Sequence, residues 1–597
     1  MWAIPDFQRY YRWSQKDVKE FHESIFNDHY VGGLLLWDIE DSDKDQCGMI
    51  EVEGSNPQKL KGEKIVLDGQ QRITSLHYAI NAPEKTEKIK DTHPGYFYIN
   101  FEKYFLDPKN DDIDTIVALN RQISDEESFE RLLFPFYKLK TVQKDAWLSN
   151  LKKFVRKYQT VDLDKLDDIV EIIRKKTSRI YHTYEIPQIV LSNTTFENVG
   201  TIFTSINTKG KPLDVFDLIN VKMAAHNVKV RTLWEDSLKQ YPKIYEYDKK
   251  LKTRMGRYIM EVISLSYSTL KSCKKNDVLE MFGREKKEER EEKIKNWTTE
   301  KFAEKWNDSA KYLNSAIKSL ENKNEGFGVI TTEVLPYEPM IPILASLLRE
   351  IEINFDDDVN CYRKLERWYW TSVFGGRFLE SVEAKKSSNF KEMIEWFKPN
   401  SETPKFIKYF QKNFKSLQLE DAINKGSVLY TGVLCLLAMK GAMDFEIRFS
   451  SKEADSHMDH IFPKSQIDKH KNKNSIFNMT WLTPETNVGT KKAKMPSKYI
   501  PEVINKKYKS EKEFRKVLVS HLINDKAYDF LLNDKFDEFI KYRKTEILKE
   551  IANKIDAVYI EEEIEENNDQ SSLVEKPTIE LLQRDEDDEL EFKATKI

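Results

Sequence analysis

Hydrophobic and polar positions divide the chain into a mixed first part and a helical remainder. In the mixed part, helix-like periodicity over 16–26 and 71–80 alternates with short runs of aliphatic and aromatic residues. From about 226 to 450 the pattern is helical, and the apolar stretch 428–439 is too short to span a bilayer, so it predicts a buried helix. The runs that predict strands are LLLWDI (34–39), KIVLD (64–68), YFYINF (96–101) and YEIPQIVL (184–191).

Residues 451–500 form a compact pattern of strand, loop, strand and helix. HMDHIF predicts one strand and IFNMTWL (476–482) a second. Thr483 is then a plausible N-cap, with Pro484 at the first helical position and Pro496 at the end of the helix. We expect a ββα unit here, followed by more helices up to about residue 556.

These patterns predict an α+β protein of several domains. The expected units are a mixed domain over 1–225, a helical linker or sensor region over 226–450, the ββα unit with its C-terminal helices over 451–556, and an acidic, disordered tail over 557–597. Charge supports the last boundary, because residues 561–597 carry a net charge of −10 whereas the whole chain carries −4. The remainder is therefore mildly basic.

Cysteine usage and the first residues bear on the compartment. The four cysteines lie far apart with no CxxC pair, which argues against a cysteine-built zinc site and suits a reducing cytoplasm. The opening MWAIPDFQRYYRW lacks a basic region followed by an apolar run, so we expect no signal peptide. We therefore expect a cytoplasmic protein with no membrane partner.

The ββα segment holds the residue types that phosphodiester hydrolysis requires. A neutral imidazole is a good base near pH 7, and His460 supplies one. A hard divalent ion prefers carboxylate and amide oxygens, which Asp459 and Asn487 offer. Asp459 and His460 are adjacent, so a regular strand would point them to opposite faces. A twisted or bent strand end would bring them together, and Asn478 could orient the imidazole.

The order and spacing of these residues resemble the HNH (His-Me finger) nuclease motif. DHIFPKS is followed by Asn478 eighteen residues after His460 and by Asn487 nine residues later. The resemblance implies that His460 is the general base, that Asp459 and Asn487 are metal ligands, and that Asn478 is the middle Asn. The family usually has Gly before that Asn, whereas Phe477 stands here. The bland alternative is a polar hairpin with a satisfied surface histidine.

Lysines surround this segment. Residues 461–498 hold eight Lys and only two acidic residues, a local charge of +6 that favours contacts with phosphates. A merely solubilising surface would explain each lysine taken singly. The side chains that we expect to contact DNA are Lys464, Lys491, Lys492 and Lys494.

A second candidate site lies in KIVLDGQQRITSLHYAI (64–80), which predicts a strand, a tight turn and a helix. Gly69 permits a sharp turn, and the N–H groups at a helix start can hold a phosphate. Arg72 offers a planar fork for phosphate oxygens, and Asp68 could hold a metal or activate water. No GxxxxGK[ST] pattern occurs, so the sequence does not support a P-loop NTPase. A purely structural turn is the alternative.

Three motifs place this turn in a wider context: IPDFQRYYRW (4–13), LDGQQR (67–72) and FTSINTKGKPLDVFDLIN (203–220). Together they resemble the N-terminal half of the GmrSD-type modification-dependent restriction endonucleases, a ParB/sulfiredoxin-like fold, and that family also has a C-terminal HNH half. The resemblance implies nucleotide binding and hydrolysis at the DGQQR box. The matching positions are Gln8, Arg9, Asp68, Gly69, Gln70, Gln71 and Arg72, with Asn207 and Gly210 in the third motif.

The two resemblances imply a nucleotide-regulated DNA endonuclease of bacterial anti-phage defence. Its cofactors would be Mg²⁺ or Mn²⁺ and an NTP, either GTP or ATP, and its substrate would be modified double-stranded DNA. A homo-oligomer is possible. A non-catalytic, nucleotide-gated DNA-binding switch with a degenerate HNH fold is the main alternative. A redox enzyme, which the sulfiredoxin-like fold would allow, is disfavoured because the cysteine nearest the DGQQR box in sequence is Cys47, in the preceding loop.

Overall fold

The structure of the protein is a computed structural model of residues 1–597. The residues that it describes are 2–5, 8, 11–40, 49–55, 64–83, 95–106, 115–158, 163–194, 198–199, 202, 216, 219–220, 223, 228–251, 255–268, 271–274, 277–278, 299–378, 381–414, 417, 419, 427–442, 444–446 and 457–559. The predicted acidic tail beyond 559 lies outside them.

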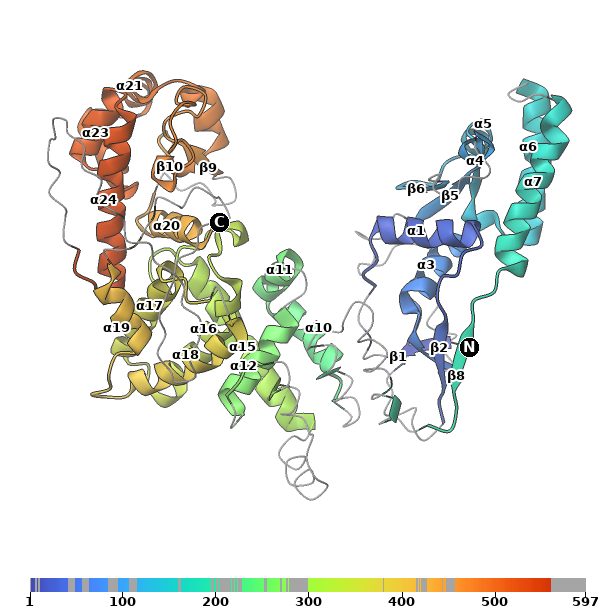
Figure 1. Cartoon of the computed structure of the whole chain (residues 1–597), viewed down its shortest axis with the longest axis horizontal. Helices are drawn as coiled ribbons and strands as arrows, with labels where there is room; N and C mark the ends of the chain where they lie inside the picture. The colour runs from blue at the N-terminus through green and yellow to red at the C-terminus, as the bar shows by residue number, and fades with distance from the viewer. Residues whose placement is uncertain are drawn as a thin grey trace, which may run out of the picture.

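Two lobes make up the described part of the molecule (Figure 1). The N-terminal lobe contains two sheets with helices packed beside them, and the C-terminal lobe is helical apart from one hairpin. The predicted α+β organisation is therefore confirmed at this coarse level.

A five-stranded mixed sheet forms the base of the N-terminal lobe. Its order is β3-β1-β4-β2-β8, with β1 and β4 parallel, β2 and β8 parallel, and β2 and β4 antiparallel. The aliphatic runs of β2 and β4 are almost fully buried, as expected for central strands. The strands are β1 (Trp2–Pro5), β2 (Leu34–Asp38), β3 (Met49–Ile50), β4 (Lys64–Asp68) and β8 (Gln188–Leu191).

A second, antiparallel sheet of order β6-β5-β7 lies in the same lobe, formed by β6 (Ile116–Leu119), β5 (Tyr96–Asn100) and β7 (Leu133–Pro135). Phe97, Ile99 and Phe134 from this sheet share one apolar core with Trp147 of the long helix α6. The helices of the lobe are α1 (Gln15–Phe26), α3 (Gln70–Asn81), α4 (Phe101–Leu106), α5 (Asp125–Glu130), α6 (Thr141–Tyr158) and α7 (Leu166–Ser178).

The C-terminal lobe begins with a helical array. Its first helices are α10 (Val230–Gln240), α11 (Pro242–Lys250), α12 (Met255–Tyr267), α15 (Thr299–Glu321), α16 (Ile341–Asn354), α17 (Val359–Phe374), α18 (Val382–Phe397), α19 (Lys405–Lys412) and α20 (Val428–Met439). The predicted buried helix is α20, which is confirmed with the same bounds. A hairpin of β9 (His457–His460) and β10 (Met479–Leu482) follows, then a π-helix (Glu485–Lys491), α21 (Pro496–Lys507), α22 (Glu511–Ser520), α23 (Asp525–Leu532) and α24 (Phe536–Ile555).

One hydrophobic core extends through this lobe from Ile219 to Ile555. Trp481 of β10 belongs to it, and its indole Nε1 donates to the Leu434 carbonyl of α20 at 3.0 Å. The boundary that we expected at residue 450 therefore does not separate two cores, because the hairpin is built onto the helical array.

Three segments differ most from the sequence expectation. The strand expected over 184–191 is only Gln188–Leu191, and the one expected over 476–482 begins with a 3₁₀ turn (Ile476–Asn478). Pro496 does not end a helix but begins α21, where its missing N–H costs no intrahelical bond. Among the described residues, no helix is long and apolar enough to cross a membrane.

Candidate functional site

The predicted sequence of strand, loop, strand and helix around His460 is confirmed as secondary structure. Strands β9 and β10 are antiparallel, with His460 opposite Met479 and Asp459 opposite Thr480. The segment 461–475 loops out between them, and the π-helix follows β10 directly. The hairpin and this helix therefore hold all the residues expected to act on a phosphodiester.

The loop is tied to the hairpin by Asn478, whose side chain is fully buried. Its Oδ1 accepts from the Phe462 N–H at 2.8 Å, and its Nδ2 donates to the carbonyls of Phe462 at 3.1 Å and Lys473 at 3.0 Å. These bonds use both donors of the amide. Asn478 thus shapes the loop and makes none of its described hydrogen bonds to the His460 ring, which we had expected it to orient.

The imidazole of His460 instead meets Asn474 and Asp459. Its Nε2 lies 3.3 Å from Asn474 Oδ1, and its Nδ1 lies 3.8 Å from Asp459 Oδ1. The carboxylate of Asp459 also accepts from the His460 backbone N–H at 2.7 Å. The two neighbouring side chains therefore do not diverge as on a regular strand, because Asp459 turns back along the chain at the end of β9.

Asp459 and Asn487 converge on one cation, the ammonium of Lys491. Lys491 Nζ donates to Asp459 Oδ2 at 2.9 Å and to Asn487 Oδ1 at 3.3 Å. Its side chain is only 2% exposed. The strand and the helix thus bring the two predicted metal ligands to a common point.

Charge at this point is balanced inside the protein. Burial alone would raise the pKa of the Asp459 carboxyl, but hydrogen bonds from His460 and Lys491 outweigh burial and lower that pKa. Asp459 is therefore an anion at neutral pH.

The oxygen pair fits a hard divalent ion. Mg²⁺ is usually held by one or two carboxylates together with waters and substrate phosphates, and not by a cage of protein ligands. The Lys491 ammonium already lies between Asp459 Oδ2 and Asn487 Oδ1, so both oxygens face a cation. Among the described residues, no group of three or more His, Cys, Asp or Glu side chains is placed to hold a metal ion.

Asp444 fixes the helix that carries Asn487. Its Oδ2 accepts from the Thr483 N–H at 2.6 Å and from the Thr483 hydroxyl at 3.0 Å, and its Oδ1 accepts from the Thr486 hydroxyl. Thr483 in turn accepts from the Thr486 N–H at 3.3 Å, as the predicted N-cap should. The sequence analysis did not single out Asp444, because a capping carboxylate thirty-nine residues before the helix leaves no local pattern.

A buried arginine supports the other side of β10. The Arg543 guanidinium of α24 is fully buried and donates to the carbonyls of Phe477 at 2.6 Å, Met479 at 2.8 Å and His521 at 3.1 Å. Burial lowers its pKa to about 9, so it is still charged at neutral pH. Carbonyl oxygens of the 3₁₀ turn, of β10 and of the residue after α22 therefore stabilise this charge and lock the hairpin onto α24.

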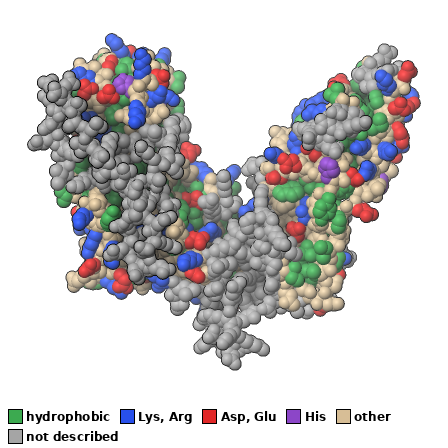
Figure 2. All heavy atoms as spheres, in the orientation of Figure 1, with side chains coloured by type: hydrophobic (Ala, Val, Ile, Leu, Met, Phe, Trp, Pro, Cys, Tyr) green, Lys and Arg blue, Asp and Glu red, His purple; other side chains and the backbone are tan. Residues whose placement is uncertain are grey.

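The four lysines that were expected to contact DNA differ in exposure. Lys464 and Lys492 are exposed, whereas Lys494 is half-buried and paired with Glu502. Lys491 is buried against Asp459, so its ammonium cannot reach a phosphate from this position. Figure 2 shows Lys and Arg side chains, interspersed with acidic ones, at the upper end of the lobe that carries the hairpin.

In the N-terminal lobe, the predicted turn between β4 and α3 is present. Gly69 has a φ of +105°, and a Cβ at this position would clash with Leu34 Cδ2. Glycine is therefore required both by the backbone conformation and by the close approach of β2. The N-cap residue of α3 is Gly69, which has no side chain that could accept a hydrogen bond from the first N–H groups of the helix.

Arg72 and Asp68 lie together at this turn. Arg72 NH2 donates to Asp68 Oδ2 at 2.8 Å and to the Gly33 carbonyl at 2.7 Å. The Arg72 Nε is buried and has no hydrogen-bond partner within the described part of the chain. Asp68 is 42% exposed, so one face of this pair is open to a ligand.

The glutamines of the predicted nucleotide site have structural contacts. The buried amide of Gln8 donates to the carbonyls of Val66 at 2.6 Å and Leu67 at 2.9 Å, which ties β1 to β4. Gln71 Oε1 accepts from the backbone N–H groups of Arg12 and Trp13. Gln70 is half-buried at the start of α3. Arg9, Asn207 and Gly210 lie outside the described residues.

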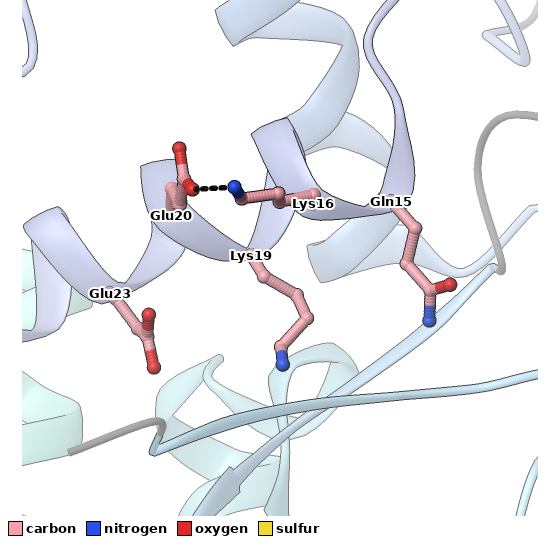
Figure 3. A pocket seen from close by; sticks show the side chains of 5 residues that line it. All are labelled: Gln15, Lys16, Lys19, Glu20 and Glu23. Atoms are coloured by element: carbon pink, nitrogen blue, oxygen red, sulfur yellow. Dashed lines mark ion pairs between the residues drawn. The ribbon is translucent and has the colours of Figure 1, made fainter.

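A shallow hollow lies beside α1, and Figure 3 shows the side chains that line it. They come from α1 alone, where Lys16 pairs with Glu20 at 3.6 Å along the helix. The lining contains none of the residues predicted to bind a nucleotide, so we assign no ligand to it. The lining residues are Gln15, Lys16, Lys19, Glu20 and Glu23.

Comparison with known proteins agrees with the motifs of the N-terminal lobe. Residues 2–224 match the family described as GmrSD restriction endonuclease, N-terminal domain. This match supports a restriction endonuclease role with DNA as the substrate. An uncharacterized protein of Methanocaldococcus jannaschii is 26% identical over 600 residues, which cover 93% of this chain and 96% of the relative. The similarity thus continues through the C-terminal lobe.

Proposed function

We propose that this chain is a nucleotide-regulated, metal-dependent endonuclease that cuts modified foreign DNA. The match of residues 2–224 to the N-terminal domain of GmrSD restriction endonucleases supports a restriction endonuclease role. The observation that carries the finer proposal is the convergence of Asp459 and Asn487 on a single cation, beside the imidazole of His460. An anion, an amide oxygen and an imidazole thus lie together where β9 meets the π-helix.

In the proposed reaction, His460 removes a proton from the attacking water. The contact of Nε2 with Asn474 and the position of Nδ1 near Asp459 hold the ring in one orientation. Asp459 and Asn487 would hold a Mg²⁺ or Mn²⁺ ion, which when bound supplies positive charge for the leaving oxygen. Lys464 and Lys492, both exposed on the same unit, would contact the DNA backbone.

Nucleotide binding is proposed at the turn between β4 and α3. The uncapped start of α3 can bind a phosphate through backbone N–H groups, and the buried Nε of Arg72 offers a further donor. Asp68 would then hold the metal of the nucleotide or activate water. Gln8 and Gln71 bind backbone groups around this turn. They would therefore act on the nucleotide indirectly, by holding the turn in position.

The proposal is tested by replacing the imidazole. We expect His460→Ala to lower metal-dependent plasmid nicking by about 10²–10⁴-fold, the usual effect of losing a general base, while NTP turnover continues. His470→Ala is the matched control, because His470 lies in the neighbouring loop with its Nδ1 3.3 Å from Asp537. Nicking that persists in His460→Ala would remove the assignment of the base.

A non-catalytic, nucleotide-gated DNA-binding switch is the second candidate. The position of Lys491 favours it, since an ammonium that is permanently bound to Asp459 would leave no place for a metal. Plasmids that are unmodified, glucosylated, methylated or phosphorothioated separate the two candidates when each is incubated with each NTP and Mg²⁺. Binding without nicking on every substrate would favour the switch.

A further inference from the structure

Lys491 stands where the proposed metal ion would bind. Its ammonium lies 2.9 Å from Asp459 Oδ2 and 3.3 Å from Asn487 Oδ1, the two oxygens expected to hold that ion. It is almost fully buried, whereas its neighbour Lys492 is exposed. A lysine at this place in the sequence would ordinarily extend into solvent, so its inward position requires a specific explanation.

The ammonium and a divalent ion cannot share these oxygens. Both are cations, and at about 3 Å separation their repulsion is strong in a partly buried site. Asp459 provides one negative charge, which a single lysine already neutralises. Binding of the ion therefore requires that the ammonium leave.

The backbone that carries Lys491 is suited to such a change. Asn487 and Lys491 lie on the same π-helix, a rare conformation that is frequent at functional sites. The next residue, Lys492, has a φ of +49°, which is strained for a side chain with a Cβ. A Cβ on Gly489 would meet no atom within 4 Å, so the middle of this helix faces open space.

We propose that Lys491 is an internal cation that closes the metal site, and that a divalent ion binds only when its ammonium withdraws. This inference rests on the proposed function, because it assigns the same two oxygens to the metal. Once withdrawn, the Lys491 ammonium would emerge beside the exposed Lys492. The same residue would then add a contact to the DNA backbone only when the metal is present.

The first test measures binding of Mn²⁺ alone to the full chain, from the loss of the free-ion signal in electron paramagnetic resonance. Lys491→Met removes the ammonium and keeps the length of the apolar stem. We expect it to tighten Mn²⁺ binding by about tenfold or more, which corresponds to a site that is closed about nine-tenths of the time. Lys498→Met, at an exposed lysine of α21, is the charge-matched control and should leave the affinity unchanged.

Asp459→Asn separates failure of this inference from failure of the proposed function. Suppose that Asp459→Asn abolishes Mn²⁺ binding but Lys491→Met leaves the affinity unchanged or weakens it. The metal site is then correct, and Lys491 does not compete with the ion. If Asp459→Asn leaves every Mn²⁺ site intact, the ion binds elsewhere and both proposals are wrong. Loss in Asp459→Asn with tightening in Lys491→Met supports both.

A second measurement uses the unaltered protein, in case Lys491→Met does not fold. An amine-acylating reagent labels accessible lysines, and mass spectrometry reports the extent of labelling at each position. We expect labelling of Lys491 to be low without metal and to rise severalfold with saturating Mn²⁺, while Lys498 stays constant. Labelling of Lys491 that does not respond to Mn²⁺ would overturn the inference.

Discussion

At the residue scale, the two candidate sites are built from side chains that are already paired. In the nuclease-like site Asp459 binds Lys491, and at the nucleotide-like turn Asp68 binds Arg72. Each pair keeps one charged group oriented before a ligand arrives, which reduces the ordering needed on binding. In each pair the ligand must also compete with a side chain of the protein, because it must replace the ion pair that is already formed.

Gly69→Ala tests the turn before α3. The left-handed φ of +105° and the close approach of Leu34 both oppose a methyl group, so we expect a loss of about 1–3 kcal/mol in the free energy of unfolding of the N-terminal lobe. NTP binding should weaken as well. Gly489→Ala is the control, since its Cβ would meet open space. Chemical denaturation of both variants measures the difference, and equal stability would show that Gly69 is not required.

Lys464→Ala tests contact with the DNA backbone. One lost phosphate contact lowers the slope of log K against log salt by about 0.9, without a change in base preference. Lys153, an exposed lysine of α6 in the other lobe, should leave the slope unchanged when replaced by Ala. Filter binding over a range of NaCl concentrations measures the slope for both variants. An unaltered slope for Lys464→Ala would mean that the DNA binds on another face.

At the element scale, the hairpin and its following helix are held by partners distant in sequence. Asp444 accepts hydrogen bonds from Thr483 and Thr486 at the start of the π-helix. The Arg543 guanidinium of α24 donates to two carbonyls of the hairpin segment and to the His521 carbonyl after α22. Asn478 closes the loop between the strands from inside. The positions of His460 and Asn487 thus depend on contacts that lie outside the motif itself.

Asp444→Ala tests the capping contact. It leaves the Thr483 N–H and two hydroxyls without their carboxylate, so we expect the free energy of unfolding of the C-terminal lobe to fall by about 2–4 kcal/mol. Mn²⁺ affinity should fall with it, because Asn487 loses its fixed position. Asp468→Ala is the matched control, since its pair with Lys473 is at the surface and should contribute less than about 1 kcal/mol. Similar melting of the two variants would contradict the role of Asp444.

At the scale of the whole molecule, the lobes have separate hydrophobic cores. Trp147 lies in one of the cores of the N-terminal lobe, whereas Trp481 lies in the continuous core that joins the helical array to the hairpin. Separate cores allow separate unfolding, while a shared core makes its elements unfold together. The helical region thus packs against the nuclease-like hairpin in one core.

Calorimetry of two tryptophan variants tests this organisation. Trp481→Ala should destabilise the transition of the C-terminal lobe by about 3–5 kcal/mol, and Trp147→Ala should act to the same extent on the other transition only. Each tryptophan also loses a hydrogen bond, to Leu434 and to Ser128 respectively. If Trp481→Ala left the helical array unchanged and melted the hairpin alone, the single core would be refuted.

The sequence by itself determined the local elements and the chemistry that they carry. Apolar runs predicted β2, β4 and α20, because a buried strand or helix requires apolar residues that are close together in the sequence. Gly69 predicted its turn, because few other residues adopt that φ. The N-terminal motifs indicated the family that residues 2–224 match. The nuclease and nucleotide roles of individual residues stay predictions.

Only the tertiary structure decided which partners meet. Asn474 contacts the His460 imidazole and Lys491 binds Asp459. Asp444 binds Thr483 at the start of a helix far along the chain, and Asn478 binds the loop instead of the imidazole. No periodicity encodes these contacts, because each depends on the packing of elements that are distant in sequence. Whether a lysine extends toward DNA or folds back onto a carboxylate is set by the space and charge around it, and these exist only in the folded chain.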